Sequence, residues 1–132
     1  KSASGDFGQT RVAAGIVGFA DLRLGAAVET VLDAHMESAP ARFRGIRFST
    51  AFDPDIKINR PRTHAKDKLF TDTTFHGGLK VLFDMGLSFD AWLYHRQIPE
   101  LTDLARAFPD APIVLDHCGG RLGLGPYADK ER

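Results

Sequence analysis

The chain has 132 residues, of which 43% are hydrophobic and 26% are charged, a length and composition that predict one globular domain. Seventeen basic and seventeen acidic side chains cancel, which argues against nucleic-acid and anionic-lipid partners. The longest uncharged and mainly apolar run, residues 12–20, is far shorter than the roughly 20 residues of a membrane span. The single cysteine excludes an internal disulfide. We therefore expect a soluble, cytoplasmic protein with a small-molecule substrate.

Strand-like and helix-like segments alternate along the chain. The hydrophobic pattern predicts strands at residues 14–21, 43–49, 87–94 and 113–117, and helices at residues 25–38, 72–85 and 98–108. The first strand is apolar almost throughout, which is typical of a strand covered on both faces. Residues 51–68 are predicted to form a loop, and residues 118–132 a tail without a further strand.

Strands that alternate with helices predict βαβ units and a parallel sheet, and so an α/β fold. A closed (β/α)₈ barrel needs about 250 residues, roughly twice what this chain supplies. The pattern leaves two architectures open: a small open doubly wound sheet, if the chain is complete, or about half of a barrel, if it is part of a longer protein. The chain begins at Lys1 and not at a methionine, as a processed product or a piece of a longer reading frame would.

Polar side chains gather at the carboxyl ends of the predicted strands, where ligands bind in parallel α/β folds. His117 ends the last strand, and an imidazole there could bind a metal or carry a proton near neutral pH. The two glycines that follow are expected to leave open space around it. A histidine held only by a backbone carbonyl is the alternative. His95, just past the third strand, is the weaker candidate for the same roles.

Four further residues are candidates for substrate binding. Arg47 could clamp a substrate carboxylate with its guanidinium, or form an ion pair with Asp21 or Asp90. Asp90, like Asp116 at the end of the last strand, could orient an imidazole or pair with an arginine. Strand alternation places Asp90, Trp92 and Tyr94 on one face, where the two aromatic rings could line a pocket or belong to the core.

The other reactive side chains are assigned no function. His35 lies on an apolar helix face and is expected to be a core histidine with satisfied ring nitrogens, and His64 and His76 carry no signal. Cys118 follows a histidine, but strand alternation would point the two side chains in opposite directions. The glycine-rich segment 119–125 lacks the G-x-G-x-x-G spacing of a phosphate-binding loop.

Four segments together resemble a known family. They read GIVGFADLR from Gly15, FRGIR from Phe43, LSFDAWL from Leu87 and IVLDHCGG from Ile113. In this order they resemble the amidohydrolase-related, metal-dependent TIM-barrel hydrolases. That group includes pyrone-dicarboxylate lactonase, sugar-lactone hydrolases of the fuconolactonase type and aminocarboxymuconate-semialdehyde decarboxylase. The similarity spans about Val12 to Tyr127.

The resemblance implies that residues 1–132 are part of such a barrel domain and carry its strands three to six. It implies that His117, and by a looser match His95, bind metal or substrate and serve catalysis, and that Arg47 faces the pocket. A divalent metal, zinc or manganese, is the implied cofactor, although relatives differ on whether they use one. The implied reaction is hydrolysis of a small cyclic ester or amide, first of all a carboxylated lactone. Non-oxidative decarboxylation, or a non-catalytic open α/β binding domain, is the alternative.

The chain departs from the family pattern in three ways. It has no His-x-His pair, which the family carries on its first strand, and no segment for the aspartate of the eighth strand. Phe48 stands where near relatives have a histidine after Gly-Ile-Arg. Because a metal held by two histidines alone binds weakly, we expect this chain by itself to have little or no activity. Open sheet edges at its first and last strands predict self-association.

Overall fold

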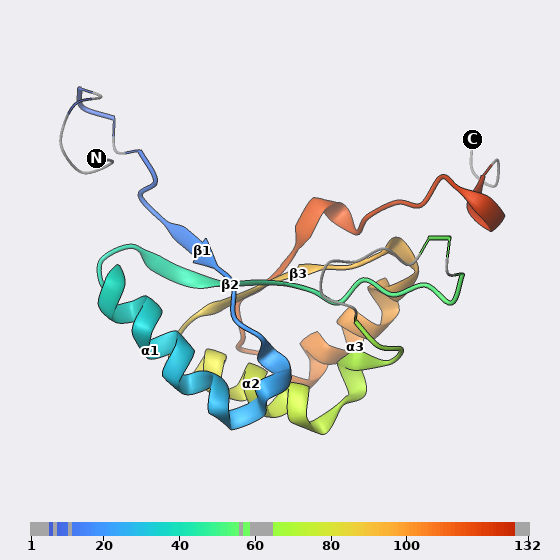
Figure 1. The fold of residues 1–132 in the computed structure, drawn as a ribbon, viewed down its shortest axis with the longest axis horizontal. Helices are drawn as coiled ribbons and strands as arrows, with labels where there is room; N and C mark the ends of the chain where they lie inside the picture. Colours follow the sequence, from blue (N-terminus) through green and yellow to red (C-terminus); the bar gives the residue numbers. More distant parts are fainter. Residues whose placement is uncertain (1–5, 7, 11, 56, 59–64, 129–132) are drawn as a thin grey trace.

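The computed structural model of the chain describes residues 6, 8–10, 12–55, 57–58 and 65–128 (Figure 1). The strands are β1 (Ile16–Gly18), β2 (Phe43–Ser49), β3 (Ser88–Trp92) and β4 (Ile113–Leu115). The α-helices are α1 (Glu29–Ser38), α2 (Thr73–Asp84) and α3 (Ile98–Ala107). Short 3₁₀ helices lie between them: η1 (Leu22–Val28), η2 (Leu69–Thr71), η3 (His95–Gln97), η4 (Asp116–Cys118) and η5 (Gly125–Tyr127).

The four strands form one parallel sheet in the order β1-β2-β3-β4. The helices α1, α2 and α3 all lie on one side of it (Figure 1). We call the opposite side, which no α-helix of the described residues covers, the helix-free face. Strands paired in chain order with helices on one side are the arrangement of a (β/α)₈ barrel, whereas a doubly wound sheet has helices on both sides. The predicted α/β parallel fold is confirmed, and it is consistent with part of a TIM barrel.

The apolar core fills the space between the sheet and the helices. Its largest fully buried side chains come from strands, helices and loops alike: Phe48, Phe75, Phe89, Leu22, Leu32, Ile46, Leu69, Leu79, Leu82 and Leu93. The ring of Phe75 on α2 lies 5.7 Å from that of Phe48 and 6.1 Å from that of Phe89, centroid to centroid. Since side chains alternate along a strand, the residues next to these two phenylalanines, Arg47 and Asp90, point to the helix-free face.

Capping contacts fix where α2 begins and ends. The carboxylate of Asp72 accepts hydrogen bonds from the amides of Thr74 and Phe75, both at 2.9 Å, in the manner of an N-cap. A hydrogen bond from Lys66, followed by those amides, holds the pKa of Asp72 below its ordinary value. Gly86 follows the helix with a φ of 71°, the left-handed conformation that ends many helices.

The first predicted helix is wrong in its opening turns. Residues Leu22–Val28 form η1, and α1 begins only at Glu29. The break comes at Gly25, whose φ of 59° and ψ of −137° are not helical. A glycine in this conformation interrupts helical hydrogen bonding, which an apolar periodicity cannot reveal.

The paired part of three strands is shorter than predicted. β1, β3 and β4 have 3, 5 and 3 residues, because pairing ends where a neighbouring strand leaves the sheet. The expectation that residues 14–21 are covered on both faces is also wrong, since Val17 is 46% and Phe19 is 55% exposed. Of residues 51–68, the described ones form no helix or strand, as predicted. No described helix combines the length and the apolarity of a membrane span.

Candidate functional site

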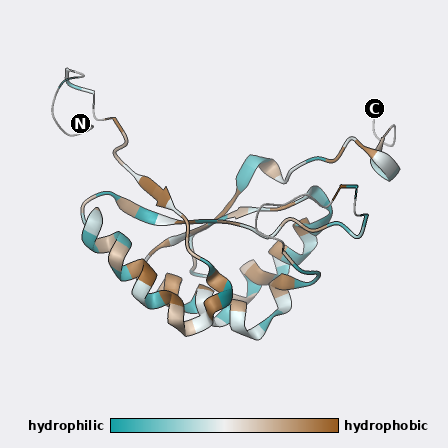
Figure 2. Cartoon of the chain, viewed as in Figure 1, coloured by the Kyte–Doolittle hydropathy of each residue, from teal (hydrophilic) through white to brown (hydrophobic). Residues whose placement is uncertain are grey.

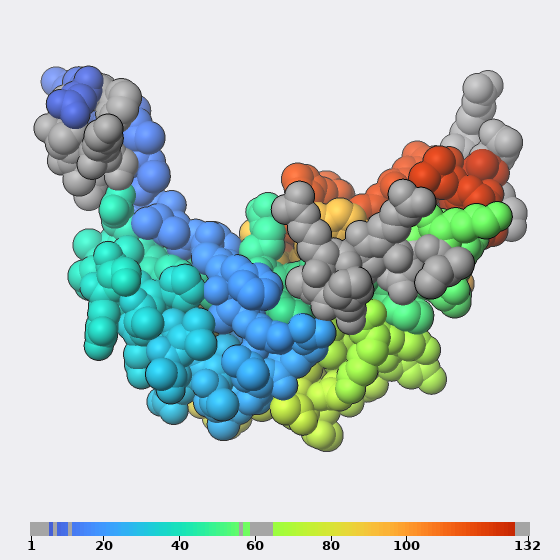
Figure 3. Space-filling view, in the orientation of Figure 1, coloured from blue at the N-terminus to red at the C-terminus, as the bar shows by residue number. Residues whose placement is uncertain are grey.

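A charged cluster occupies the centre of the helix-free face. Arg47 of β2 and Asp90 of β3 are direct partners in the register of the sheet. The Nε and Nη2 atoms of Arg47 donate hydrogen bonds to Oδ2 of Asp90 at 2.9 and 2.7 Å. The same Nη2 lies 3.1 Å from Oδ1 of Asp116, the residue that follows β4. Two neighbouring strands and the residue after a third therefore bring one charged side chain each to a single point. Figure 3 shows that the surface dips on this side of the sheet, between the blue N-terminal segment and the red C-terminal segment.

The two carboxylates of this cluster are buried and the guanidinium is not. The side chains of Asp90 and Asp116 are each 7% exposed, and that of Arg47 is 49% exposed. The hydrogen bond to Asp90 and the nearby negative charges raise the pKa of Arg47, so that it stays positively charged. Buried carboxylates need such a cation, because ionised groups lose hydration energy on burial. Asp90 Oδ1 and Asp116 Oδ2 are buried without a hydrogen-bond partner among the described residues.

The ion-pair alternative for Arg47 is therefore present, with Asp90 and not with Asp21. Asp21 instead caps η1 and accepts hydrogen bonds from Nε and Nη2 of Arg23 at 2.8 and 2.7 Å. These bonds lower the pKa of Asp21. An arginine anchored on one side and half-exposed on the other can still receive a ligand carboxylate. Substrate binding by Arg47 stays a prediction.

His117 lies beside the cluster but outside the strand. Its Nε2 is 3.6 Å from Oδ1 of Asp116, and its side chain is 67% exposed. β4 ends at Leu115, and both His117 and Cys118 have left-handed backbones, with φ of 50° and 56°. The strand alternation expected for this pair therefore does not apply. Cys118 is an exposed free thiol.

The ring of His117 has open space around it, as expected, but the two glycines after Cys118 serve close packing elsewhere. A Cβ atom on Gly120 would lie 2.6 Å from the indole of Trp92. Gly119 has a φ of 76°, and a Cβ there would lie 3.0 Å from Ile98. The two glycines instead allow the segment after β4 to approach the end of β3 and the start of α3.

His95 is held by that same segment. It begins η3 directly after Tyr94 and is half-buried. The amide of Leu122 donates to Nδ1 of His95 at 3.3 Å, and the amide of His95 donates to the carbonyl of Gly120 at 3.1 Å. The ring meets that of Tyr127 edge-on, at 5.6 Å. These contacts from the folded tail help to position His95.

The described residues do not fit a metal ion by themselves. Among them there is no group of three or more His, Cys, Asp or Glu side chains that could hold one. Nδ1 of His95 is engaged with Leu122, and Nε2 of His117 faces the carboxylate of Asp116. Metal ligation by His95 and His117 stays a prediction, and no chemical step below passes through a metal.

Trp92 and Tyr94 lie together at the carboxyl end of β3. Their rings meet edge to face with centroids 5.5 Å apart, in agreement with the shared face predicted for them. The hydroxyl of Tyr94 donates to the carbonyl of Ile58 at 3.2 Å. Trp92 is the register partner of Ser49, two residues beyond Arg47 along β2. The pair lies near enough to the charged cluster to border a substrate, and this role stays a prediction.

The other three histidines are those that were assigned no function from the sequence. Nε2 of His35 lies 3.0 Å from the carbonyl of Phe19, and its ring stacks on Phe43, so one ring nitrogen has a partner as predicted, but the residue is half-buried and not in the core. The ring of His76 contacts the carbonyl of Phe70. His64 lies outside the described residues.

Gln97 is a structural anchor of this end of the sheet that the sequence did not reveal. It is buried, accepts a hydrogen bond from the amide of Phe52 at 2.9 Å, and donates one to the carbonyl of Thr50 at 2.9 Å. It thereby ties the loop after β2 to the loop after β3. No motif marks it. Asp116, in contrast, was a candidate partner for an arginine from the sequence, and it pairs with Arg47.

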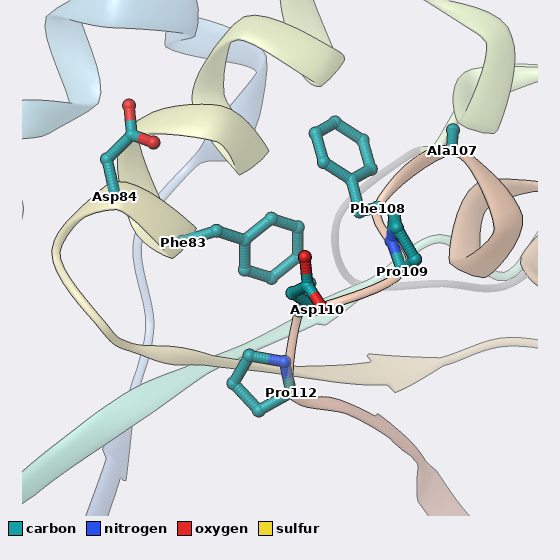
Figure 4. Close-up of a pocket in the computed structure, with 8 residues that line it drawn as sticks. Phe83, Asp84, Ala107, Phe108, Pro109, Asp110 and Pro112 are labelled. Carbon is teal, nitrogen blue, oxygen red and sulfur yellow. The ribbon is translucent and has the colours of Figure 1, made fainter.

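A pocket of about 300 Å³ lies at the other end of the sheet (Figure 4). Its lining comes from the ends of α2 and α3 and the turn before β4: Phe83, Asp84, Ala107, Phe108, Pro109, Asp110, Ala111 and Pro112. In parallel α/β folds ligands bind at the carboxyl ends of the strands, whereas this pocket lies where β4 starts. We assign it no function.

Comparisons with known proteins agree with this geometry. A family model described as Amidohydrolase matches residues 10–129, a range that includes the sheet, the charged cluster and both candidate histidines. "Uncharacterized protein y4mH" of Sinorhizobium fredii (strain NBRC 101917 / NGR234) is 41% identical over 108 residues, which are 80% of this chain and 33% of that protein. The chain thus spans about a third of the length of this relative. No solved structure matches the chain. By the family match over most of its length, the chain belongs to the amidohydrolase family.

Proposed function

We propose that this chain is part of an enzyme that hydrolyses a small cyclic ester or amide, with a carboxylated lactone as its substrate. Membership of the amidohydrolase family supports a hydrolase-like function. The observation that carries the substrate class is the guanidinium of Arg47, fixed by two buried carboxylates and 49% exposed on the helix-free face. Its Nε and Nη2 atoms face Asp90 and Asp116, so a ligand carboxylate would be bound through Nη1.

The proposed roles of the other residues rest on their contacts and on the resemblance to the family. His117, beside Asp116, would act as a general base toward water or as a proton donor near neutral pH. His95 would interact with the reacting carbonyl. Asp90 keeps Arg47 in place, and Trp92 and Tyr94 would shape the pocket wall around the lactone ring.

The proposed cofactor and cellular location of the whole enzyme rest on its family and its sequence. Amidohydrolases typically bind divalent metals, which supports zinc or manganese as the cofactor. Because the described residues do not fit a metal by themselves, its ligands would have to include residues outside them. The free thiol of Cys118 supports a reducing, cytoplasmic location.

A non-oxidative decarboxylase is the second candidate, because Arg47 would serve a carboxylated aromatic acid as well as a carboxylated lactone. The two reactions differ in whether the substrate loses its carboxylate. Decarboxylation releases carbon dioxide from the carboxylate, whereas hydrolysis opens the ring and leaves the carboxylate intact. A product analysis of the whole enzyme with both substrates separates them.

The test of substrate class is binding to the 132-residue chain. A carboxylated lactone and the uncharged lactone with the same ring are titrated, and the side-chain NMR signals of Arg47 and His117 are followed. We expect the carboxylated lactone to bind about tenfold more tightly, a difference of about 1.4 kcal/mol. Arg47→Lys, which keeps a charge to face Asp90 but has no second nitrogen equivalent to Nη1, should remove most of this preference.

Equal binding of the two lactones would contradict the proposed substrate class. The same samples, with zinc or manganese added, are assayed for lactone opening. We expect turnover by the chain alone to stay near the background rate, since the family's remaining catalytic groups are not among the described residues. Rapid turnover would show that the described residues suffice for hydrolysis.

A further inference from the structure

The segment that follows β4 passes the carboxyl ends of β3 and β2. We call residues 119–127 the strap. At its start, the amide of Gly120 donates a hydrogen bond to the carbonyl of Leu93 at 2.7 Å, and the carbonyl of Gly120 accepts one from the amide of His95 at 3.1 Å. At its far end, Tyr127 contacts the loop after β2, and Figure 3 shows the red C-terminal segment against that green loop. The strap is therefore tied to the rest of the chain near both of its ends.

The far end of the strap is fixed by the hydroxyl of Tyr127. This hydroxyl donates a hydrogen bond to Oδ2 of Asp53 at 2.8 Å and accepts one from Nη1 of Arg96. The guanidinium of Arg96 also lies 5.4 Å from the centre of the Tyr127 ring. Asp53 is 2% exposed, and its other oxygen accepts a hydrogen bond from the amide of Asp55 at 2.9 Å. One hydroxyl thus joins the strap to the loops after β2 and β3, through two charged groups that strengthen its hydrogen bonds.

The middle of the strap is loosely packed. Among the described residues, no atom lies within 4 Å of a Cβ placed on Gly123, and Leu124 is 68% exposed. The helix η5 at the far end has only 3 residues. Segments with few buried contacts open at a lower free energy than core strands. The strap can therefore leave the sheet without unfolding the core, once its end contacts are released.

The turn from which the strap starts is strained. His117, Cys118 and Gly119 follow one another with φ of 50°, 56° and 76°. A left-handed backbone is unfavourable for a residue with a Cβ, and it persists only where surrounding contacts maintain it. Here β4 has already ended at Leu115, and the contacts that follow are those of the strap. Release of the strap would let His117 and Cys118 return to ordinary backbone conformations, which favours opening.

The strap covers the end of β3. A Cβ on Gly120 would lie 2.6 Å from the indole of Trp92, so the backbone of the strap packs directly on this ring. Gly120 also forms an isolated parallel bridge with Tyr94. Opening of the strap would therefore uncover both aromatic residues at this end of the sheet.

We propose that the strap is a lid that opens as one unit about Gly119, and that the hydroxyl of Tyr127 is the latch that keeps it closed. Lids of this kind turn about a few loop residues and control the access of ligands to a site. That Trp92 and Tyr94 border a substrate rests on the proposed function, whereas the opening is a property of the folded chain. If the carboxylated lactone fails to bind while the strap opens as expected, the proposed function fails and the lid stands.

Hydrogen exchange followed by NMR on the 132-residue chain measures the opening. Tyr127→Phe keeps the ring and removes the hydroxyl. Because that hydroxyl bonds two charged groups, its loss should speed the exchange of the Gly120 and Leu122 amides about tenfold, by the same factor for both. The amide of Phe89, bonded to the carbonyl of Pro112 in the sheet, should keep its rate. Unchanged exchange, or faster exchange of Leu122 alone, would overturn the proposal.

Trypsin gives a second measure of the same opening. Cleavage after the exposed Arg121 requires the strap to leave the sheet, and its rate follows the population of the open form. The rate should rise about tenfold in Tyr127→Phe. Leu124→Ala is the matched control within the strap, because this side chain is 68% exposed, and it should change the rate by less than about twofold. An equal rise in the two variants would mean that the strap has no latch at Tyr127.

A change at Asp53 tests the partner of the latch. Asp53→Asn keeps an oxygen acceptor but loses the charge, and it should speed the exchange of Gly120 and Leu122 by a smaller factor, about threefold. Added to Tyr127→Phe, it should have no further effect, since the two changes weaken the same hydrogen bond. Factors that multiply in the double variant would show that Asp53 does not hold the latch.

Cys118→Gly tests the strain at the start of the strap. Glycine adopts a left-handed backbone without the steric penalty of a Cβ, which stabilises the closed form by more than the added freedom stabilises the open form. Exchange of the Gly120 and Leu122 amides should therefore become about threefold slower. Unchanged or faster exchange would contradict a strained turn that favours opening.

Discussion

Replacing Gly78 by alanine is expected to lower the free energy of unfolding by about 3 kcal/mol, the upper range for overpacking a core. Gly78 lies on α2, where the helix passes η1. A Cβ at this position would lie 2.2 Å from the carbonyl oxygen of Leu22 and 3.0 Å from its carbonyl carbon. Because these are backbone atoms, no side-chain rotation can relieve the contact. The helix and η1 would have to separate, which would expose buried residues such as Leu22.

Gly77→Ala is the matched control on the same helix. Its nearest neighbours would be Cα of Gly25 at 3.8 Å and the amide nitrogen of Ala26 at 4.0 Å, which are ordinary contacts. Alanine also favours a helix over glycine by about 1 kcal/mol, so Gly77→Ala should be neutral or stabilising. Urea unfolding followed by circular dichroism gives both values. Similar values for the two variants would show that α2 does not contact η1 as closely as described.

Replacing Arg47 by methionine should also cost about 3 kcal/mol of stability, because it leaves two buried carboxylates without their cation. Asp90 and Asp116 are each 7% exposed, and Arg47 is the partner of both. Methionine keeps much of the apolar length of the side chain, so the loss reports mainly on the charge. The measurement is urea unfolding at neutral pH.

An exposed arginine provides the comparison for this variant. Arg106 pairs with Asp103 on the surface of α3, where the two side chains are 74% and 75% exposed. Exposed pairs contribute little, and Arg106→Met should cost less than about 0.5 kcal/mol. Adding Asp90→Asn to Arg47→Met should recover part of the stability, since one buried charge is removed. Equal losses in the two arginine variants would mean that the cluster on the helix-free face is not held by charge.

The order and type of the main elements could be read from the sequence, because apolar periodicity reports directly on which side chains are buried. Arg47 shows what can and what cannot be predicted from the sequence. The family resemblance implied that it faces the pocket, and in the structure it lies between the buried Ile46 and Phe48, on the opposite face of the strand. Its pairing with Asp90 depends on the register between β2 and β3, 43 residues apart, which a local pattern does not contain.

Backbone conformation accounts for the other differences between the predictions from sequence and the structure. The left-handed residues Gly25 and His117 end regular structure at places where the side-chain pattern continues. Gly119 and Gly120 are visible as glycines, but whether they open a space or permit close packing depends on what lies opposite. Here Trp92 and Ile98 lie opposite, and the space is filled.

This chain should associate with another protein chain through the helix-free face and the outer edges of the sheet. Val17, the register partner of Gly45, and Val114, the register partner of Asp90, lie on this face and are 46% and 50% exposed. Parallel sheets are normally covered on both faces, and unpaired edges readily pair with other strands. We propose a second copy as the partner. With β4 of each copy beside β1 of the other, eight parallel strands would close around a twofold axis.

Light scattering of the purified 132-residue chain during size-exclusion chromatography tests most directly whether the chain is part of a barrel. Two partial barrels that complete each other should have a mass about twice the 14.5 kDa of one copy. The apolar face should then resist binding of a hydrophobic dye. A stable monomer of 14.5 kDa that unfolds cooperatively would contradict the account, because it would show that a four-stranded sheet with a helix-free face suffices as a domain.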